Sequence, residues 1–431
     1  MSKFLGRIKN FINRQTDNFK ALLLVNISNN AVRSLTAGQN MGGGATGTAS
    51  YAQLYLSAIG ANPQQLGYLN SVGKVANALI ALPLGWISDR FSLKKIVLIG
   101  LLLSALVPAA YALSTTWIQA LPALVLDTIM TMLLGMFITL FYITSIKESS
   151  DRGTAMSMRS MFVSIIGLLT PTISAIIVLN AGGITAEGIR PLFIIEIVAN
   201  FVILLYAFFK LKEVSHLQKK GIEQKRSFLQ DYKEIAKIPV VQKWTLFKGI
   251  RSFFSTSLIP FFSIYYVRVK GADEITLAAM GTVSVLGALL FLIPLGRMAD
   301  KYGRKKIIYL TRPFYYTSLL LIILAPSPNY LILSSFLGAL QSVGTLMEIT
   351  MEWELVPGNQ RGRLAGFQSF FWGLSSVPGL LLLGYLWERI NPAYLLLTPI
   401  ISELPHLLFL TTIPDTLHVV YTHEPSRTIG T

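Results

Sequence analysis

The chain has 431 residues, of which 52% are hydrophobic and only 13% are charged. A soluble domain carries about 25% charged residues, so this composition excludes one large soluble core and indicates membrane helices. The net charge of +16 would suit nucleic acid, but most Lys and Arg residues lie in alternate loops and at the termini. That asymmetry is the positive-inside pattern of a membrane protein, and we expect no nucleic-acid partner.

The positive-inside pattern also predicts the orientation of the chain. It puts both termini and the central loop in the cytoplasm, which requires an even number of spans. We expect a multi-pass protein of the cell (cytoplasmic) membrane whose outer surface contacts the lipid bilayer. The absence of cysteine excludes disulfides and thiol chemistry. The first apolar run begins near Ala21 and continues into the fold, so no cleavable signal peptide is indicated.

The N-terminal segment 1–19 is expected to be cytoplasmic and interfacial. Its apolar residues fall on one helical face and its basic residues elsewhere, which suits a helix lying on the membrane surface. A frayed tail is an equally good interpretation.

The first span is unusually long. It runs from about Lys20 to Leu56, roughly 55 Å as one helix at about 1.5 Å per residue, against a bilayer core of about 30 Å. The excess contains Gly42-Gly43-Gly44 and Gly47. We expect a broken or unwound helix there, a feature that often marks a binding site. The alternative is an extracellular glycine-rich loop after a normal span.

Further apolar runs predict an all-α membrane protein with twelve transmembrane helices in two six-helix bundles. The predicted domains are an N-terminal bundle at 20–210, a cytoplasmic central loop at 211–243, a C-terminal bundle at 244–413 and a cytoplasmic tail at 414–431. The later spans are expected at about 64–87, 95–114, 117–146, 154–179, 190–210, 244–267, 276–299, 306–325, 329–355, 362–387 and 391–413.

Two similar stretches support a repeat of one half by the other. Gly-Arg-Met-Ala-Asp-Lys-Tyr-Gly-Arg-Lys-Lys at 296–306 has a weaker copy at 85–95, 211 residues earlier, and both follow Pro-Leu. A second echo places Arg152 and Arg361 209 residues apart.

These two stretches resemble the loop motif of the major facilitator superfamily of secondary transporters. The family motif reads Gly-x-x-x-Asp-Arg-x-Gly-Arg-Arg/Lys; Lys301 replaces the first Arg in the second copy, and Ser92 and Leu93 replace Gly and Arg in the first. The resemblance implies two pseudo-symmetric six-helix bundles and a cytoplasmic latch between them, not substrate contact. The latch residues it implies are Gly85, Asp89, Arg90, Gly296, Asp300, Gly303 and Arg304. Asp89 and Asp300 are expected to accept hydrogen bonds from a helix N-terminus or an arginine.

The first half carries polar residues at helical spacing inside its spans. They are Asn26, Asn29, Asn30 and Arg33 on span 1, Asn70, Lys74 and Asn77 on span 2, and Asp127 and Thr131 on span 4. Arg33, Lys74 and Asp127 lie about 12–18 Å deep, where an unpaired charge costs at least about 2.5–3.5 kcal/mol. We predict that Asp127 pairs with Arg33 or Lys74 and leaves one cation for a substrate. The alternative is an ion pair that only fixes helix packing. The proposed binding and coupling residues of this half are Asn26, Asn30, Arg33, Asn70, Lys74 and Asp127.

The second half carries two pairs of opposite charge. Lys248 and Arg251 are three residues apart on span 7, and Glu348 and Glu352 are four apart on span 10. Because these spans run in opposite directions, we predict the pairs Arg251–Glu348 and Lys248–Glu352, acting as a gate that breaks in another state. The alternative is that Lys248 and Glu352 reach the membrane interface separately.

Glu196 and Glu403 occupy similar repeat positions, with Asn200 and His406 one turn further along. The resemblance places their helices at the periphery of the fold. We interpret both carboxylates as ties to neighbouring helices and keep a proton site as the alternative.

The sequence therefore predicts a secondary transporter that moves a small organic solute by alternating access, and not an enzyme. We expect no cofactor and no metal, because no nucleophile–base constellation and no His/Cys cluster is present. A polar or anionic substrate is favoured, with protonation of Asp127 or Glu348 as the coupling step and the monomer as the working unit. Aromatic residues of the second half keep a proton-coupled exporter of lipophilic compounds as an alternative. A membrane sensor or scaffold on the same fold is a second alternative.

Overall fold

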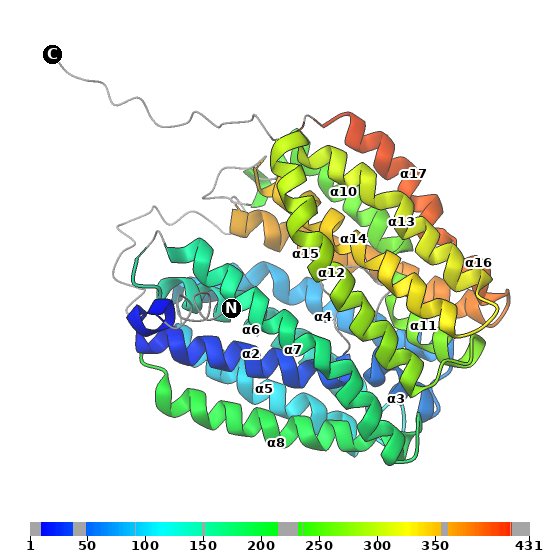
Figure 1. The fold of residues 1–431 in the computed structure, drawn as a ribbon, viewed down its shortest axis with the longest axis horizontal. Helices are drawn as coiled ribbons and strands as arrows, with labels where there is room; N and C mark the ends of the chain where they lie inside the picture. Colours follow the sequence, from blue (N-terminus) through cyan, green and yellow to red (C-terminus); the bar gives the residue numbers. More distant parts are fainter. Residues whose placement is uncertain are drawn as a thin grey trace.

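The computed structural model describes residues 10–37, 49–90, 92–148, 151–213, 232–234, 236–354, 361–413 and 415. Within these ranges the chain forms helices and short connections (Figure 1). The N-terminal half contains α2 (Asp17–Ala37), α3 (Tyr51–Ala58), α4 (Pro63–Arg90), α5 (Leu93–Leu113), α6 (Leu121–Thr144), α7 (Arg152–Asn180) and α8 (Ala186–Lys210).

The C-terminal half repeats this arrangement with more interruptions. Its elements are α10 (Pro239–Phe254), the 3₁₀ turn η2 (Thr256–Leu258), α11 (Ile259–Ile264), the π-turn η3 (Tyr265–Val269), α12 (Glu274–Tyr302), α13 (Arg304–Leu324), α14 (Asn329–Glu354), α15 (Arg361–Trp387), α16 (Pro392–Leu395) and α17 (Thr398–Thr411).

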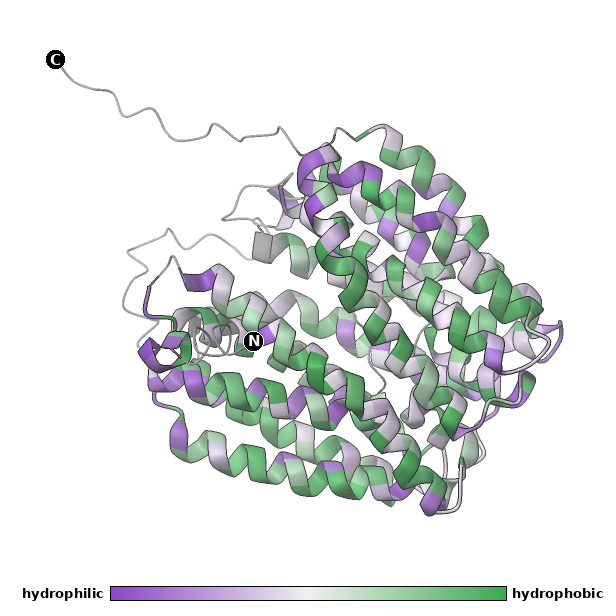
Figure 2. Ribbon diagram, in the orientation of Figure 1, coloured by the Kyte–Doolittle hydropathy of each residue, from purple (hydrophilic) through white to green (hydrophobic). Residues whose placement is uncertain are grey.

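Within the described ranges, nine helical segments are long and apolar enough to cross a membrane. Their outer faces are apolar, as Figure 2 shows, and α8 alone exposes Ile194, Val198, Phe201, Val202 and Phe209. The other helical segments at span positions are α2, α4 and the run from α10 to η3, which are more polar or broken. The protein is thus an all-α integral membrane protein, and the count of twelve spans stays a prediction.

Two predicted spans are wrong in detail because proline interrupts them. The span at 244–267 is broken after Phe254. Pro260 has no N–H to donate, and its ring crowds the carbonyl of Thr256 four residues earlier. The Ser257 hydroxyl donates a hydrogen bond of 3.0 Å to the Ser252 carbonyl, so this backbone oxygen has a partner in spite of the break. The last span is likewise divided between α16 and α17, which begins with Pro399 in its first turn.

The structure separates the first predicted span into α2, ending at Ala37, and α3, beginning at Tyr51. Gly42, Gly43, Gly44 and Gly47 lie outside the described residues. Residues 10–16, just before α2, pack against the α6–α7 connection, where Asp151 accepts from Arg14 at 2.6 Å and from Gln15 at 2.7 Å.

The helices have two common ends. We call the end where α2 and α10 begin the near end, and the opposite end the far end. The described hydrogen bonds between the halves lie in the far half of the molecule. Ser50 N–H donates to Ser263 Oγ at 2.8 Å, Arg268 donates to the Ser57 carbonyl at 3.1 Å, and Thr282 donates to the Leu168 carbonyl at 3.3 Å. In Figure 1 the two halves diverge towards the near end, where α2 begins.

The tightest inter-half packing joins α4 to α15. Glycines permit it: a side chain on Gly67 would meet the Leu380 carbonyl oxygen, and one on Gly384 would lie 2.9 Å from the Pro63 carbonyl oxygen. These contacts bring the backbones of the two halves together without intervening side chains.

Gly67→Ala should therefore destabilise the protein by about 1–3 kcal/mol, the usual cost of overpacking, because the new methyl group displaces α15. Thermal unfolding of the detergent-purified protein measures the effect. Gly135→Ala on α6 is the matched control, since no atom lies within 4 Å of its added carbon. Equal unfolding midpoints for the two variants would contradict the close packing of α4 on α15.

Candidate functional site

A polar cavity of about 410 Å³ lies between the halves. The N-terminal half lines it with α2, α3, α4, α5, α6 and α8, and contributes the charged groups Arg33, Lys74, Asp127 and Glu196. The C-terminal half contributes Thr256, Ile259, Pro260 and Ser263 from the break between α10 and α11. The cavity thus lies where backbone is irregular and both halves meet, the usual place for a ligand in such a fold.

The predicted ion pair across the cavity is formed by Arg33 and not by Lys74. Arg33 Nη2 lies 3.0 Å from Asp127 Oδ1 and also donates to Thr131 Oγ1 at 3.0 Å. The Asp127 side chain is 43% exposed and the Arg33 side chain 27% exposed, so the pair faces the cavity and is not sealed in a core.

Lys74 lines the same cavity from α4 and is half-buried. No carboxylate of the described residues lies within ion-pair distance of its ammonium group. Of Arg33, Lys74 and Asp127, Lys74 is therefore the residue that forms no ion pair within the described ranges. Because Asp127 already contacts Arg33, this half-buried ammonium is available to anionic or strongly polar groups.

The polar residues of α2 do not all face the cavity. Asn26 accepts from Arg159 Nε on α7 at 2.7 Å, and the exposed Asn30 donates to the Asn26 carbonyl at 2.7 Å. Neither lines the cavity. Asn29 instead points into the bundle, where it donates to Asn200 at 3.0 Å.

On α4, by contrast, Asn70 does line the cavity. Its amide group exchanges two hydrogen bonds of 3.1 Å with Gln53 of α3. This amide pair offers donors and acceptors of the kind that bind hydroxyl or carbonyl groups.

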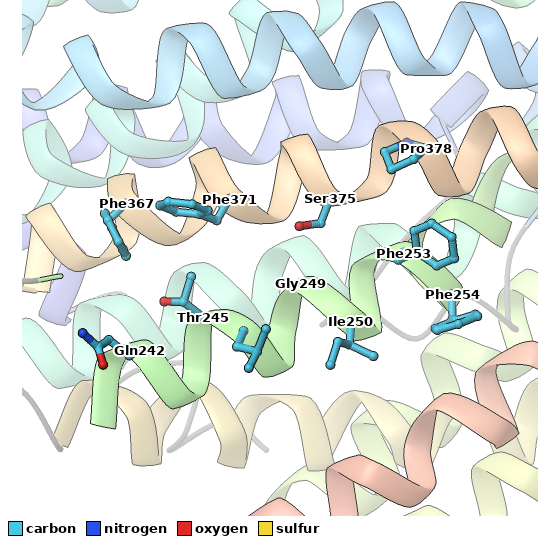
Figure 3. Close-up of a pocket in the computed structure, with 11 residues that line it drawn as sticks. Gln242, Thr245, Gly249, Ile250, Phe253, Phe254, Phe367, Phe371, Ser375 and Pro378 are labelled. Atoms are coloured by element: carbon cyan, nitrogen blue, oxygen red, sulfur yellow. The ribbon is translucent and has the colours of Figure 1, made fainter. Parts of the chain in front are cut away.

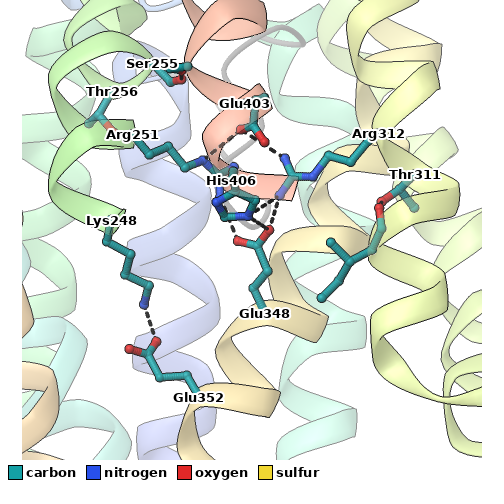
Figure 4. A network of polar contacts seen from close by, with 12 residues as sticks. Lys248, Arg251, Ser255, Thr256, Thr311, Arg312, Glu348, Glu352, Glu403 and His406 are labelled. Carbon is teal, nitrogen blue, oxygen red and sulfur yellow. Dashed lines mark hydrogen bonds and ion pairs between the residues drawn. The ribbon is translucent and has the colours of Figure 1, made fainter. Parts of the chain in front are cut away.

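The C-terminal half contains a buried ring of four charges (Figure 4). Arg251 of α10 lies 2.7 Å from Glu348 of α14 and 3.3 Å from Glu403 of α17. Arg312 of α13 pairs with the same two carboxylates, at 3.2 Å to Glu403. Each arginine therefore contacts both carboxylates, and the ring is electrically balanced. The predicted pair Arg251–Glu348 is confirmed, and Glu403 ties α17 to its neighbours as interpreted.

His406 completes this group. Its Nε2 lies 2.9 Å from Glu348 and 3.2 Å from Arg312, and its side chain is 2% exposed. Three buried polar atoms of the ring have no partner: Arg312 Nε, Glu403 Oε2 and His406 Nδ1.

The second predicted pair, Lys248–Glu352, is also formed, and Gln368 of α15 donates to Glu352. The Lys248 side chain is 15% exposed and that of Glu352 only 3%. The two residues therefore bind each other and do not extend separately to the interface.

The latch residues of the C-terminal half are held within that half. Gly303, with φ +102°, ends α12 and begins α13. The first N–H groups of α13, at Arg304 and Lys305, donate to Asp415 at 3.3 and 3.2 Å, and Arg304 pairs with Glu354 of α14.

Asp300 is exposed, and the hydrogen bond expected of it is not formed among the described residues. Asp415 takes the position at the helix N-terminus instead, because Gly303 provides no capping side chain. The side chains of Asp89 and Arg90 lie outside the description, and Gly296 has no atom within 4 Å of an added carbon.

A second cavity, apolar and of about 620 Å³, lies between α10 and α15 (Figure 3). Phe253, Phe254, Phe367 and Phe371 line it together with Thr245. Phe261 and Phe262, which are also aromatic residues of the second half, are instead buried in the core. The described residues include no group of three or more His, Asp or Glu suited to a metal ion.

Sequence reasoning missed Arg312 and Arg159. Arg312 is 1% exposed at the centre of the ring, and Arg159 bonds Asn26 and Thr139. The signal was available, since each is a lone arginine within an apolar run. Both lie only about two turns from a basic helix end, where an arginine is ordinarily read as part of the loop.

Glu348→Gln should destabilise the protein by about 3–5 kcal/mol, because both ring arginines would then share one carboxylate. Adding Arg312→Gln restores the charge balance and should recover part of the loss. Thermal unfolding of both variants measures this. Glu388→Gln, at an exposed position, is the control. Additive losses from Glu348→Gln and Arg312→Gln would contradict a coupled ring.

Comparison with known proteins gives a family and a fold. The family model described as "Major Facilitator Superfamily" matches residues 35–271 and 249–419. No curated protein is detectably similar in sequence. Among solved structures, the nucleoside transporter NupG is similar with a TM-score of 0.69 at 13% identity, covering 92% of this chain and 99% of its own.

Two further structures agree in fold. The D-xylose-proton symporter has a TM-score of 0.69 at 14% identity, covering 93% of this chain and 99% of its own. An inward-facing, occupied bacterial homologue of the human lysosomal transporter Spinster has a TM-score of 0.64 at 15% identity, covering 91% and 95%. The family match spans both halves, and the arrangement of helices around a central polar cavity agrees with it, so the chain belongs to the Major Facilitator Superfamily.

Proposed function

We propose that the protein is a secondary active transporter that moves a small polar or anionic organic solute across the cell membrane by alternating access. The solute binds in the polar cavity between the halves. Lys74 carries this proposal: its half-buried ammonium forms no ion pair within the described residues, and it lies in a cavity that both halves line. A protein with no ligand for that cavity would gain nothing from the cost of holding the charge there.

The lining also suits the neutral part of such a solute. Asn70, Gln53 and Thr128 offer amide and hydroxyl groups beside the charged residues. The nucleoside transporter and the D-xylose-proton symporter of the same fold act on solutes rich in hydroxyl groups. We therefore favour a hydroxylated organic solute that carries a carboxylate or a similar anionic group.

The charge distribution supports an orientation with the near end in the cytoplasm, because the basic helix ends and connections gather there. The described hydrogen bonds between the two halves lie towards the far end, which would be the extracellular end in this orientation. The described conformation would therefore be closed to the outside and inward-facing. We propose that Lys248–Glu352 and the near-end latch rearrange when the halves rock to the outward-facing state.

Proton coupling is part of the proposal, but neither carboxylate suggested by the sequence is well suited to it. Asp127 contacts Arg33, and Glu348 lies among Arg251, Arg312 and His406. Both carboxylates are therefore already engaged in ion pairs with arginines. The proton carrier must be sought among carboxylates without a cationic partner.

A second candidate function rests on the apolar cavity between α10 and α15. Its four phenylalanines and volume of about 620 Å³ suit a lipophilic compound. In an exporter of such compounds, the compound would bind in this cavity and its affinity would not depend on Lys74. A sensor or scaffold would carry no solute through either site.

Lys74→Gln should weaken binding of organic anions at least tenfold, the effect of about 1.4 kcal/mol, because it removes the unpaired cation and leaves Arg33–Asp127 intact. Ligand-induced thermal shifts across organic anions, sugars, amino acids and lipophilic cations measure this. Lys237→Gln, at an exposed near-end position, is the control. Stabilisation by lipophilic cations alone, lost in Phe371→Ala, would move the site to the apolar cavity.

Joining the halves at the far end should stop transport. The chain has no cysteine, so Ser50→Cys with Ser263→Cys gives a single thiol pair, at the contact where the Ser50 backbone N–H donates to Ser263. Oxidation with copper phenanthroline should abolish uptake of the stabilising solute into proteoliposomes, and reduction should restore it. Each single variant is the control. Uptake that continues after complete cross-linking would rule out rocking at this contact, and no uptake of any stabilising solute by the unmodified protein would favour a sensor.

A further inference from the structure

Glu196 is a buried carboxylate that the ion pairs described above do not use. It lies on α8, whose other face is covered with exposed apolar side chains, and it is 4% exposed. Its Oε1 accepts from the Thr36 hydroxyl at 2.7 Å and from the Thr36 backbone N–H at 3.2 Å. The residue ties α8 to α2, as the sequence interpretation expects, but it also lines the polar cavity between the halves.

Glu196 has no cation as a direct partner within the described residues. The charged groups that interact with it across the cavity are Arg33 on α2 and Asp127 on α6, and these two bind each other. Beside it on α5 stands the hydroxyl of Tyr111. The other helices packed on α8 add no charge there: α7 presents Ser174, which donates to the Leu35 carbonyl, and α3 presents Tyr55, which donates to the Ser114 carbonyl.

A buried carboxylate with two donors and no cation is costly as an anion, and its ordinary way to avoid that cost is to take up a proton. The protonated form keeps the contact with Thr36, because its carbonyl oxygen still accepts both hydrogen bonds. Glu196 can therefore gain and lose a proton without breaking the tie between α8 and α2.

Its protonation state sets the charge of the cavity. With Glu196 ionised, Arg33 and Lys74 are balanced by Asp127 and Glu196. With Glu196 protonated, the cavity holds one uncompensated positive charge, that of Lys74. A monoanion then restores neutrality. Proton and anion thus favour each other's binding, and by linkage the effect is reciprocal.

We infer that Glu196 carries the proton that accompanies an anionic solute, so that one proton and one monoanion cross together with no net charge, an assignment that rests on the proposed transport of such a solute. On the side where the cavity is open, the proton passes from water to a Glu196 carboxylate oxygen as the anion binds beside Lys74. On the other side both leave, and Glu196 returns to its ionised form.

The experiment has one arm without solute and one with it. In the first, infrared difference spectroscopy follows the C=O band of a protonated carboxyl through a pH titration of the purified protein. The band should titrate in the wild type and be missing in Glu196→Gln, which keeps an acceptor for Thr36. Glu388→Gln, exposed at the end of α15, should keep the band. An unchanged band in Glu196→Gln would overturn the assignment whatever the solute is.

In the second arm, lactate, gluconate and glucuronate are titrated into weakly buffered protein while a pH dye reports proton uptake. The wild type should bind at least one of these anions about tenfold more tightly at mildly acid than at mildly alkaline pH, with proton uptake. Glu196→Gln should bind it equally at both and take up no proton. Binding of an anion with proton uptake unchanged in Glu196→Gln overturns the inference and leaves the proposed function standing. Binding of D-xylose but of no anion overturns the anionic class and the coupling together.

Discussion

A charge inside a membrane protein must have a counter-charge, a hydrogen-bonded setting or water, and this constraint organises both halves. In the C-terminal half, the constraint is satisfied by a closed set of ion pairs. Arg251 and Arg312 each contact Glu348 and Glu403, so four helices are held by a ring with no net charge. The N-terminal half meets it only in part, since Arg33 and Asp127 pair and Lys74 does not. The two halves share a fold and differ in what their charges are available to do.

The same constraint relates the irregular backbone to the cavity. Backbone groups freed by a break cannot remain unsatisfied in lipid, so a broken helix needs either protein or an aqueous cavity around it. The break after Phe254 has both: Ser257 bonds the Ser252 carbonyl, and Thr256, Pro260 and Ser263 face the cavity. Ser263 then accepts from Ser50 of the other half. The element that lines the site is thus also the element that closes its far side.

Sequence reasoning predicted the fold and the charge pairs that depend on spacing alone. Arg251 and Glu348 follow from two antiparallel helices with charges at matching depths. The polar stripe of α2 shows the limit of such reasoning. Asn26, Asn29, Asn30 and Arg33 share a helical face by spacing, yet they contact α7, α8, their own helix and α6 respectively. A face as wide as this one meets several neighbours, and only the packing of the bundle decides which residue meets which.

Arg312 and Glu196 were harder to predict for a related reason. The depth of a charge can be counted from a helix end only when that end is known, and the basic run at 304–306 made the start of α13 ambiguous for Arg312. Glu196 was assigned to the periphery because its helix is peripheral, and α8 does present most of its surface to lipid. A peripheral helix still has one inner face, and Glu196 on that face reaches the cavity beside Thr36 of α2 and Tyr111 of α5. The position of a helix in a bundle therefore predicts the environment of most of its residues. The role of a single residue depends on the direction in which its own side chain points.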